Sequence, residues 1–299
     1  MNLPDTCTEF SATITQLYGH DGRLWLESLP NRVAICAEQW DLTDLSVSPH
    51  LSYNYVVMAR RSTDNAPVVI KLGYDANTLH YEQTALELYK ASGCVRLLAH
   101  DAQQQALLLE QLIPARPLSS VFPHHENLAI EQLVSIMKQL HAVPLPNTTQ
   151  LPTIGDWLSI LEHDCQEIPA YHVHKARKLA RQLLASQQKP VLLHGDLHQG
   201  NILSDNARWR AIDPKGVMGE SAYEVGTFIR NPTQLLIEHE YAQAIITNRI
   251  NLFAELMRID RQRIKDWSYV QAVLAAFWQE QDGLDSEDMI RAAELIDQA

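Results

Sequence analysis

The chain has 299 residues, 46% of them hydrophobic, which is enough to bury a sizeable core in one large or two smaller domains. Acidic residues outnumber basic ones by 36 to 24 and give a net charge of −12, so we expect no nucleic-acid partner and favour a cationic one. No apolar run approaches the roughly 18 residues of a membrane span, and Asp5 and Glu9 stand where a signal peptide would have a basic start, so we expect a cytoplasmic protein without a membrane partner.

Short β-rich runs dominate the first part of the chain. They are separated by Asp, Asn, Pro and Gly residues typical of turns, which predicts a small antiparallel sheet. The runs are "NYVVMARRS" (54–62), "APVVIKLGY" (66–74) and "QALLLEQLI" (105–113). The sequence changes from short β-rich runs to helical patterns near residues 107–118. We therefore expect a boundary between a domain of residues 1–112 and a domain of residues 113–299.

One of these runs contains a lysine. Apolar residues flank Lys71 within "VVIKL", and a buried ammonium group is unfavourable without an anionic partner. The stretch "TLHYEQTALELYKASG" (78–93) predicts a helix that ends at Gly93 and carries Glu82 on its apolar face, turned toward the sheet and Lys71. In protein kinases such a Lys–Glu pair positions the α- and β-phosphates of the nucleotide. A surface lysine beside an incidental glutamate is the ordinary alternative.

The part of the chain beyond the expected boundary is mainly helical. Four long stretches have apolar residues every three or four positions, which is typical of helices packed on a core. They are "ENLAIEQLVSIMKQLHAV" (126–143), "KARKLARQLLASQ" (175–187), "TQLLIEHEYAQAIITNRINLFAELM" (233–257) and "SYVQAVLAAFWQEQDG" (268–283). The fold class is therefore α+β, with a small antiparallel sheet followed by helices.

One clear β segment interrupts this helical half, at "KPVLLHGDLHQGNILSDNARWRAIDPKG" (189–216). It predicts a strand, a polar loop and then a hairpin, with the polar residues at the strand ends. Asp196 and Asn201 lie on the loop, and Asp213 ends the returning strand. We therefore expect these three oxygen-bearing side chains to converge.

The residue types at this place fit phosphoryl transfer. Asn201 and Asp213 offer oxygen ligands of the kind that Mg²⁺ prefers, the remaining ligands coming from water and substrate phosphates. Asp196 is then left to accept a proton from an attacking hydroxyl group, which is the task of the aspartate in a kinase catalytic loop. The Asp-x-x-x-x-Asn spacing of Asp196 and Asn201 fits that template.

Two other interpretations of the loop are open. His194 and His198 have the i, i+4 spacing of a helical zinc site, although Gly195 and Gly200 disfavour a helix and no third ligand is evident. A polar turn whose Asp and Asn bond backbone amides is the structural alternative. The cysteines add no thiolate zinc site, since none form a CxxC pair, and we expect reduced, mostly buried thiols at Cys7, Cys36, Cys94 and Cys165.

These motifs together resemble the aminoglycoside and hydroxyurea resistance kinase family, which includes streptomycin 6-phosphotransferases, within the kinase-like phosphotransferases. The resemblance covers nearly the whole chain. It is carried by "AEQWDLT" (37–43), "RLLAHD" (96–101), "HGDLHQGNIL" (194–203), "AIDPKG" (211–216), "GESAYEVG" (219–226) and "AAFWQEQDG" (275–283). It implies a two-lobed protein-kinase-like fold with a small antiparallel-sheet N-lobe and a mainly helical C-lobe. It also implies an ATP-dependent phosphotransferase that uses Mg²⁺ and acts on an alcohol group.

The resemblance further implies a role for each matching residue. In the predicted C-lobe, Asp196 would be the catalytic base, and Asn201 and Asp213 would be the Mg²⁺ ligands. In the predicted N-lobe, Lys71 and Glu82 would clamp the phosphates. Residues 110–113 would face the adenine, and this stretch includes Glu110 and Leu112.

Two positions depart from the family's pattern. His194 and Glu224 are expected to brace the catalytic loop, but related enzymes usually have Asp at the position of Glu224. The nucleotide loop of protein kinases is rich in glycine, whereas "SPHLSYNY" (48–55) has none, so Ser52 and Asn54, or the neighbouring tyrosines, would contact the phosphates. This loop is the one feature that favours a pseudokinase, a binding module without catalysis.

The acceptor has to be predicted from the C-terminal part of the chain. Its hydroxyl group must come within hydrogen-bond reach of Asp196, and carboxylates and aromatic faces would hold a polycationic sugar. Trp278, Glu280 and Asp282 supply such groups, and a solvated acidic helix end is the ordinary alternative. We therefore expect a small, cationic acceptor of the streptomycin type, with another amino alcohol, sugar or choline-like metabolite as the alternative. The sequence does not indicate which oligomeric state the protein has.

Overall fold

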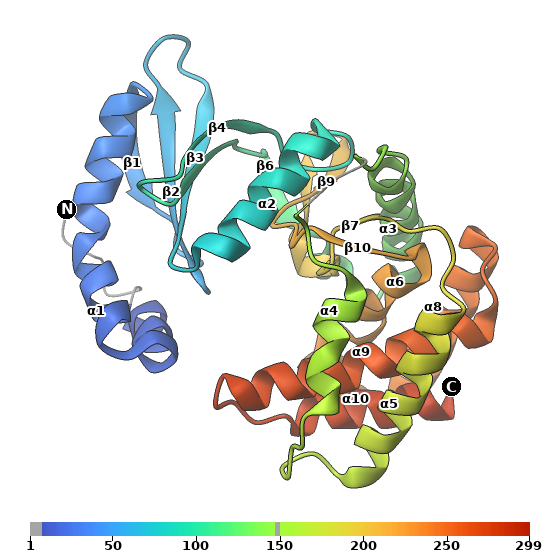
Figure 1. The fold of residues 1–299 in the computed structure, drawn as a ribbon. Coiled ribbons are helices and arrows are strands. Elements are labelled where there is room, and N and C mark those ends of the chain that lie inside the picture. Colours follow the sequence, from blue (N-terminus) through green and yellow to red (C-terminus); the bar gives the residue numbers. More distant parts are fainter. Residues whose placement is uncertain (1–7, 147–149) are drawn as a thin grey trace. The chain divides into compact units, whose positions relative to one another are not determined.

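The computed structural model describes residues 8–146 and 150–299 (Figure 1). Contacts between residues divide the chain into two compact units. The first comprises Met1–Ala91 and Val95–Leu112, and the second comprises Ser92–Cys94 and Ile113–Ala299.

An antiparallel five-stranded sheet forms the centre of the first unit, with the strand order β1-β2-β3-β5-β4. The strands are β1 (Leu42–Val47), β2 (Asn54–Arg61), β3 (Pro67–Gly73), β4 (Leu97–Asp101) and β5 (Ala106–Glu110). The three apolar runs predicted as strands form β2, β3 and β5 in the middle of the sheet. β1 and β4 form its edges, and their side chains are more exposed, so their sequences carry a weaker strand pattern.

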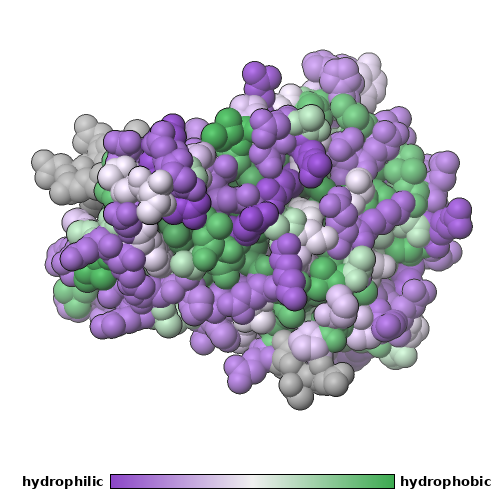
Figure 2. All heavy atoms as spheres, turned by 90° about the horizontal axis from the view of Figure 1, so that it is seen from above, coloured by the Kyte–Doolittle hydropathy of each residue, from purple (hydrophilic) through white to green (hydrophobic). Residues whose placement is uncertain are grey.

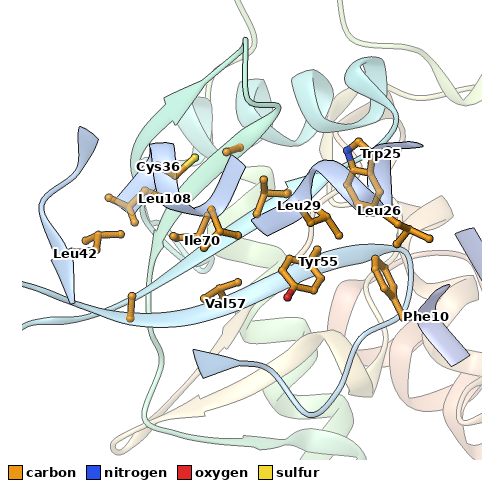
Figure 3. Packing of buried hydrophobic residues seen from close by; sticks show 14 of the residues in the cluster. Phe10, Trp25, Leu26, Leu29, Cys36, Leu42, Tyr55, Val57, Ile70 and Leu108 are labelled. Carbon is orange, nitrogen blue, oxygen red and sulfur yellow. The ribbon is translucent and has the colours of Figure 1, made fainter. Parts of the chain in front are cut away.

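A long helix, α1 (Thr8–Gln39), covers one face of this sheet and was not predicted from the sequence (Figure 1). Its backbone leaves helical geometry at Gly19, where φ is 59°. Buried side chains of α1, such as Leu29 and Cys36, pack with Ile70 of β3 and with neighbouring strand residues (Figure 3). Because side chains alternate along a strand, Lys71 points to the opposite face of the sheet from Ile70.

The helix α2 (Ala76–Tyr89) follows β3. The side chain of Asp75 caps its first turn by accepting hydrogen bonds from the Asn77 backbone N–H at 2.9 Å and from the Thr78 hydroxyl at 2.6 Å. The helix ends at Tyr89 and not at Gly93 as predicted, because Lys90 adopts a left-handed conformation and its N–H bonds back to Leu86.

Helices form most of the second unit, as predicted. They are α3 (Glu126–His141), α4 (Ile154–Leu158), α5 (Ala170–Ala185), α6 (Ser221–Arg230), α7 (Thr233–Ile237), α8 (Ala242–Met257), α9 (Arg261–Gln281) and α10 (Glu287–Gln298). Short 3₁₀ helices add η2 (Leu118–Val121), η3 (Ser159–Glu162) and η4 (Gln199–Asn201). The buried helix α9 packs against α5, α6, α8 and α10 and forms the centre of this unit.

The helical stretch predicted over 233–257 is divided into two helices, α7 and α8, with a turn between them. Within the turn, the ring Nδ1 of His239 accepts a hydrogen bond from the N–H of Tyr241 at 3.1 Å. This local bond replaces a helical one and lets the chain change direction. Apolar periodicity continues across the turn and therefore conceals it.

Two small sheets position the predicted catalytic loop. β7 (Val191–Leu193) pairs with β10 (Val217–Gly219), and β8 (Ile202–Asp205) pairs with both β6 (Pro114–Pro117) and β9 (Arg208–Ala211). The predicted hairpin is β8–β9, while β6 and β10 are additional strands. The loop joins β7 to β8, so each of its ends is held in a different sheet.

Three of the cysteines are free thiols, with Cys36 and Cys94 buried and Cys165 partly exposed, as predicted, and Cys7 lies outside the described residues. Among the described residues, no helix is both long and apolar enough to cross a membrane. Hydrophilic side chains cover most of the face shown in Figure 2.

Candidate active site

A buried ion pair joins β3 and α2 in the first unit. The Lys71 Nζ donates hydrogen bonds to both carboxylate oxygens of Glu82, at 2.8 and 2.7 Å. The two residues are only 2% and 4% exposed, so each charge depends on the other for compensation. The pair predicted from the sequence is therefore present, whereas its contact with a nucleotide stays a prediction.

The other predicted nucleotide-binding residues lie on the same sheet or on its connections. Ser52 belongs to the connection between β1 and β2, and Asn54 begins β2 opposite Gly73. Glu110 ends β5, where its side chain accepts a hydrogen bond from the Arg96 N–H at 2.7 Å. Leu112 is buried at the end of the unit. These positions leave the predicted nucleotide roles open.

The second residue of the predicted catalytic loop is a glycine that no other residue could replace without strain. Gly195 has φ of +83°, a left-handed conformation that favours glycine. A Cβ atom there would lie 2.6 Å from Cη2 of Trp157 and 2.9 Å from Cγ1 of Val217. The backbone of Gly195, immediately before Asp196, is thus packed tightly between α4 and β10.

The structure brings Asp196 and Asn201 together, as predicted. The Asn201 side-chain amide donates to the Asp196 carbonyl at 3.0 Å and to its carboxylate at 3.3 Å. The Asn201 carbonyl in turn accepts from the Ile212 N–H at 2.9 Å, in continuation of the β8–β9 ladder. Asp213 follows Ile212 directly in the chain, and its convergence with the other two side chains stays a prediction. The Asp196 side chain stays 31% exposed.

The donor set fits a hard divalent cation. Because Asn201 uses its amide nitrogen toward Asp196, its amide oxygen remains as an acceptor. The carboxylate of Asp213, which follows the neighbouring strand, would be the second oxygen donor. Oxygen donors of this kind, completed by water and phosphate, suit Mg²⁺.

The structure does not support the alternative zinc site. The His194 ring is engaged with the Ile212 carbonyl at 2.8 Å, and the His198 ring accepts from the Gly200 N–H at 3.0 Å. Neither histidine lies on an α-helix. In the parts of the chain described, no group of three or more His, Cys, Asp or Glu residues could hold a metal ion.

The carboxylate of Glu224 on α6 contacts the loop backbone. Its two oxygens accept from the N–H groups of His194 and Gly195, at 2.7 and 2.9 Å, and one of them lies 3.3 Å from the His141 ring. Glu224 is 1% exposed. The longer side chain therefore reaches the loop although Asp was the expected residue type, and its effect on turnover stays a prediction.

His194 links the two sides of the loop. Its Nδ1 accepts from the Asp196 N–H at 3.3 Å, so its Nε2 must carry the proton donated to the Ile212 carbonyl. Burial lowers the pKa of His194, although the carboxylates of Glu224 and Asp196 act to raise it. The neutral ring thus holds the backbone of Asp196 and the strand end before Asp213 in one arrangement.

Two contacts of this site were missed by the sequence analysis. Gln199 ties the loop to the end of α6 by donating to the Asn231 carbonyl at 2.7 Å. Trp157 packs on Gly195, as described above, from a helix that Thr153 and Asp156 begin with a capping box. The sequence "TIGDW" is typical of a helix start, but no sequence pattern predicts that Trp157 contacts the loop.

The predicted acceptor residues lie at the end of α9. The Trp278 ring makes an edge-to-face contact with Trp157, with centroids 5.6 Å apart. Glu280 follows on the last turn, and Asp282 caps the helix end. Burial raises the pKa of Asp282. Trp278 is therefore connected to the loop through Trp157, while binding of an acceptor stays a prediction.

An antiparallel sheet unit and a mainly helical unit carrying this loop define the kinase-like phosphotransferase class. A solved aminoglycoside phosphotransferase, a thermostable mutant of APH(4)-Ia in a ternary complex with ADP and hygromycin B, has the same fold. Its TM-score is 0.66 at 14% identity, over 89% of this chain and 96% of that one. The predicted fold class is thereby confirmed.

Residues 39–283 match the model of the aminoglycoside/hydroxyurea antibiotic resistance kinase family, so the chain belongs to that family. The streptomycin 6-kinase of Streptomyces glaucescens is 27% identical, over 91% of this chain and 90% of its own. The hydroxyurea phosphotransferase of Kitasatospora aureofaciens is 28% identical, over 89% and 77%. The predicted family and the predicted enzyme class, a phosphotransferase, are both confirmed.

Proposed function

We propose that this chain transfers the γ-phosphate of ATP to a hydroxyl group of a streptomycin-type aminoglycoside. The observation that carries the proposal is the loop on which Asn201 holds Asp196 through two hydrogen bonds. Family membership and the streptomycin 6-kinase relative support the choice of reaction and acceptor. A cytoplasmic location, where ATP is available, belongs to the same proposal, and no nucleic-acid or membrane partner is part of it.

Asp196 is the proposed catalytic base. Its backbone is held by His194 and Asn201, while its carboxylate is exposed enough to meet an acceptor hydroxyl group. The carboxylate would orient that hydroxyl group and take its proton as the new P–O bond forms. A positioned base of this kind contributes about 10²- to 10⁴-fold to the rate.

Asn201 and Asp213 are the proposed ligands of Mg²⁺, through the amide oxygen of the first and the carboxylate of the second. When bound, the ion offsets negative charge on the phosphate groups during transfer. The chain's own cation for the same purpose is Lys71, which Glu82 holds in place. Ser52, Asn54, Glu110 and Leu112 complete the proposed nucleotide site.

The test uses labelled ATP, Mg²⁺ and a panel of acceptors that includes streptomycin, hydroxyurea, choline and neutral sugars. We expect the label on streptomycin, and we expect Asp196→Asn to lower kcat at least 100-fold without weakening ATP binding. Asp205→Asn is the matched control, because Asp205 lies in the same hairpin and pairs with Arg210 instead.

Two results would contradict the proposal. Transfer to choline or a neutral sugar in preference to every aminoglycoside would make a different metabolite the acceptor. ATP binding without transfer to any acceptor would favour the pseudokinase alternative. Nucleotide binding is followed by thermal shift, since a ligand at about 100 times its Kd adds about 2.7 kcal/mol of stability.

A further inference from the structure

Two tryptophans of the second unit form an aromatic pair beside the catalytic loop. The rings of Trp157 and Trp278 meet edge to face, at 84° and 5.6 Å. Both side chains are partly exposed, unlike Trp267, which is fully buried and donates its indole N–H to Glu220. Within the described residues, the indole N–H groups of Trp157 and Trp278 have no protein acceptor. These two rings are therefore not held in the core by a hydrogen bond.

The position of Trp157 is fixed by the loop itself. Its six-membered ring lies so close to Gly195 that a Cβ atom there would be 2.6 and 3.2 Å from two ring carbons. The next residue after Gly195 is Asp196, the proposed base. Any molecule that rests on the free part of this ring therefore lies next to the loop that carries out the chemistry.

The backbone holds α4 firmly against the site. A capping box between Thr153 and Asp156 begins the helix, and the N–H of Met218 donates to the Pro152 carbonyl at 2.8 Å. Met218 belongs to β10, which pairs with β7, the strand that leads into the catalytic loop. Trp157 thus presents a preorganised surface, which binds a ligand at lower entropic expense than a mobile side chain.

Two acidic residues lie close to the aromatic pair along the chain. Asp156 precedes Trp157 and is exposed, and hydrogen bonds from Thr153 lower the pKa of its carboxyl group. Asp282 lies one turn after Trp278, and its N–H donates to the Trp278 carbonyl at 3.0 Å. On a helix surface, residues four positions apart are neighbours. Aromatic faces next to carboxylates are the surroundings that a desolvated organic cation prefers.

We infer that Trp157 and Trp278 bind a guanidinium or ammonium group of the acceptor, and that Trp157 is a specificity residue that places the acceptor beside Asp196. The inference rests on the proposed function, because it names how that site recognises its substrate. A cation on an aromatic face is held with an affinity gain of roughly 5- to 30-fold per ring. The pair therefore selects cationic acceptors over neutral ones of similar size.

The first experiment measures KM and kcat for streptomycin, a polycation, and for hydroxyurea, which is neutral at pH 7. We expect Trp278→Leu and Trp157→Leu each to raise the KM for streptomycin by roughly 5- to 30-fold. The KM values for hydroxyurea and for ATP should stay within twofold of the wild type. Trp40→Leu is the matched control, since Trp40 packs on the core of the first unit.

Trp157 also touches the loop, so a purely structural role has to be separated from recognition. Trp157→Phe keeps an aromatic face and should restore most of the affinity for streptomycin lost in Trp157→Leu. Trp278 is not among the side chains nearest to a Cβ atom at Gly195 and contacts Trp157 instead, so its replacement disturbs the loop less directly. An equal loss of kcat for both acceptors, with an unchanged KM for streptomycin, would overturn the inference.

The second experiment distinguishes failure of this inference from failure of the proposed function. Binding of streptomycin is followed by calorimetry in the wild type and the two Leu variants, without ATP. If the wild type binds streptomycin but transfers phosphate to nothing, the function fails, and weaker binding by the variants still supports the aromatic pair. If transfer occurs and the variants bind streptomycin as tightly as the wild type, the inference fails while the function stands. If the wild type does not bind streptomycin at all, the inference is overturned.

Discussion

Glu224 shows how much one buried side chain can organise. Its carboxylate accepts two backbone N–H groups of the catalytic loop and approaches the His141 ring, and water has no access to it. Both loop N–H groups would otherwise be buried without a partner, which is unfavourable for any folded protein. An aspartate would have to stand closer to the loop to make the same bonds, so the longer residue sets the distance between α6 and the loop.

Replacing Glu224 by Gln should therefore be harmful despite the similar shape. Glutamine has one acceptor oxygen, and its NH₂ group would face one of the two N–H donors. We expect Glu224→Gln to lower the free energy of unfolding by about 1–3 kcal/mol and to reduce kcat while the KM for ATP is unchanged. Denaturant unfolding and steady-state kinetics measure both effects. Glu287→Gln, at an exposed position, is the control, and equal stability of the two variants would contradict the assignment.

His194 makes the stability of the chain depend on pH. Burial lowers its pKa below the unfolded value of 6.5, so below pH 6.5 the unfolded chain takes up a proton that the folded chain excludes. The free energy of unfolding therefore falls as the pH falls from about 6.5 toward 5, by up to about 1.4 kcal/mol per pH unit. Well above pH 6.5 both states are neutral at this residue and the contribution is constant.

The variant His194→Gln tests this directly. Glutamine keeps a donor for the Ile212 carbonyl but does not titrate, so its unfolding free energy should fall less steeply between pH 6.5 and 5 than that of the wild type. Denaturant titrations at several pH values give the two slopes. The exposed His124→Gln variant should keep the wild-type slope. Parallel slopes for His194→Gln and the wild type would show that another group titrates.

At the scale of single residues, the sequence predicted what local patterns encode. Lys71 could be paired with Glu82 because each lies on a recognisable face of a strand or helix. The contact between Trp157 and Gly195 could not be predicted, since it joins α4 to a loop that lies far along the chain. Contacts of that kind depend on tertiary packing, and neither residue type nor spacing contains them.

At the scale of elements, cap residues decide where the functional side chains are held. Asp75 satisfies the first turn of α2 through Asn77 and Thr78, and Glu82 lies on the same helix. We expect Asp75→Ala to lower the free energy of unfolding by about 0.5–2 kcal/mol and to raise the KM for ATP, because a frayed first turn lets Glu82 move away from Lys71. Asp75→Asn keeps a capping oxygen and should stay near the wild type in both measurements. A destabilised Asp75→Ala variant with an unchanged KM for ATP would show that this cap does not help to hold Glu82 against Lys71 for ATP binding.

The elements that sequence reasoning missed have weak or misleading local patterns. The helix α1 has an interruption at Gly19 and a proline within it, both of which argue against one long helix. The edge strands β1 and β4 bury few side chains, so they lack the apolar alternation of β3. The break at His239 depends on a side-chain to backbone bond that periodicity does not report.

At the scale of the whole molecule, the two units do not follow the chain as simply as the sequence suggests. Ser92–Cys94 belong to the second unit, although the first unit continues to Leu112. The reason is backbone pairing, since the N–H of Ala211 donates to the Gly93 carbonyl at 2.9 Å and Cys94 forms a bridge with Ala211. Short backbone pairings of this kind do not depend on amino-acid composition. The change from β-rich to helical patterns along the sequence therefore cannot predict them.

The net charge of −12 belongs to the whole molecule and leads to a prediction about salt. A negatively charged protein attracts a polycationic acceptor over distances that salt shortens, from a Debye length of about 30 Å at 0.01 M to about 8 Å at 0.15 M. The KM for streptomycin should therefore rise severalfold between these ionic strengths, while the KM for neutral hydroxyurea stays constant. Initial rates at fixed ATP and Mg²⁺, with KCl as the added salt, measure both. Equal salt dependence for the two acceptors would mean that salt acts on the nucleotide or the fold, and that charge attraction plays no part in binding the acceptor.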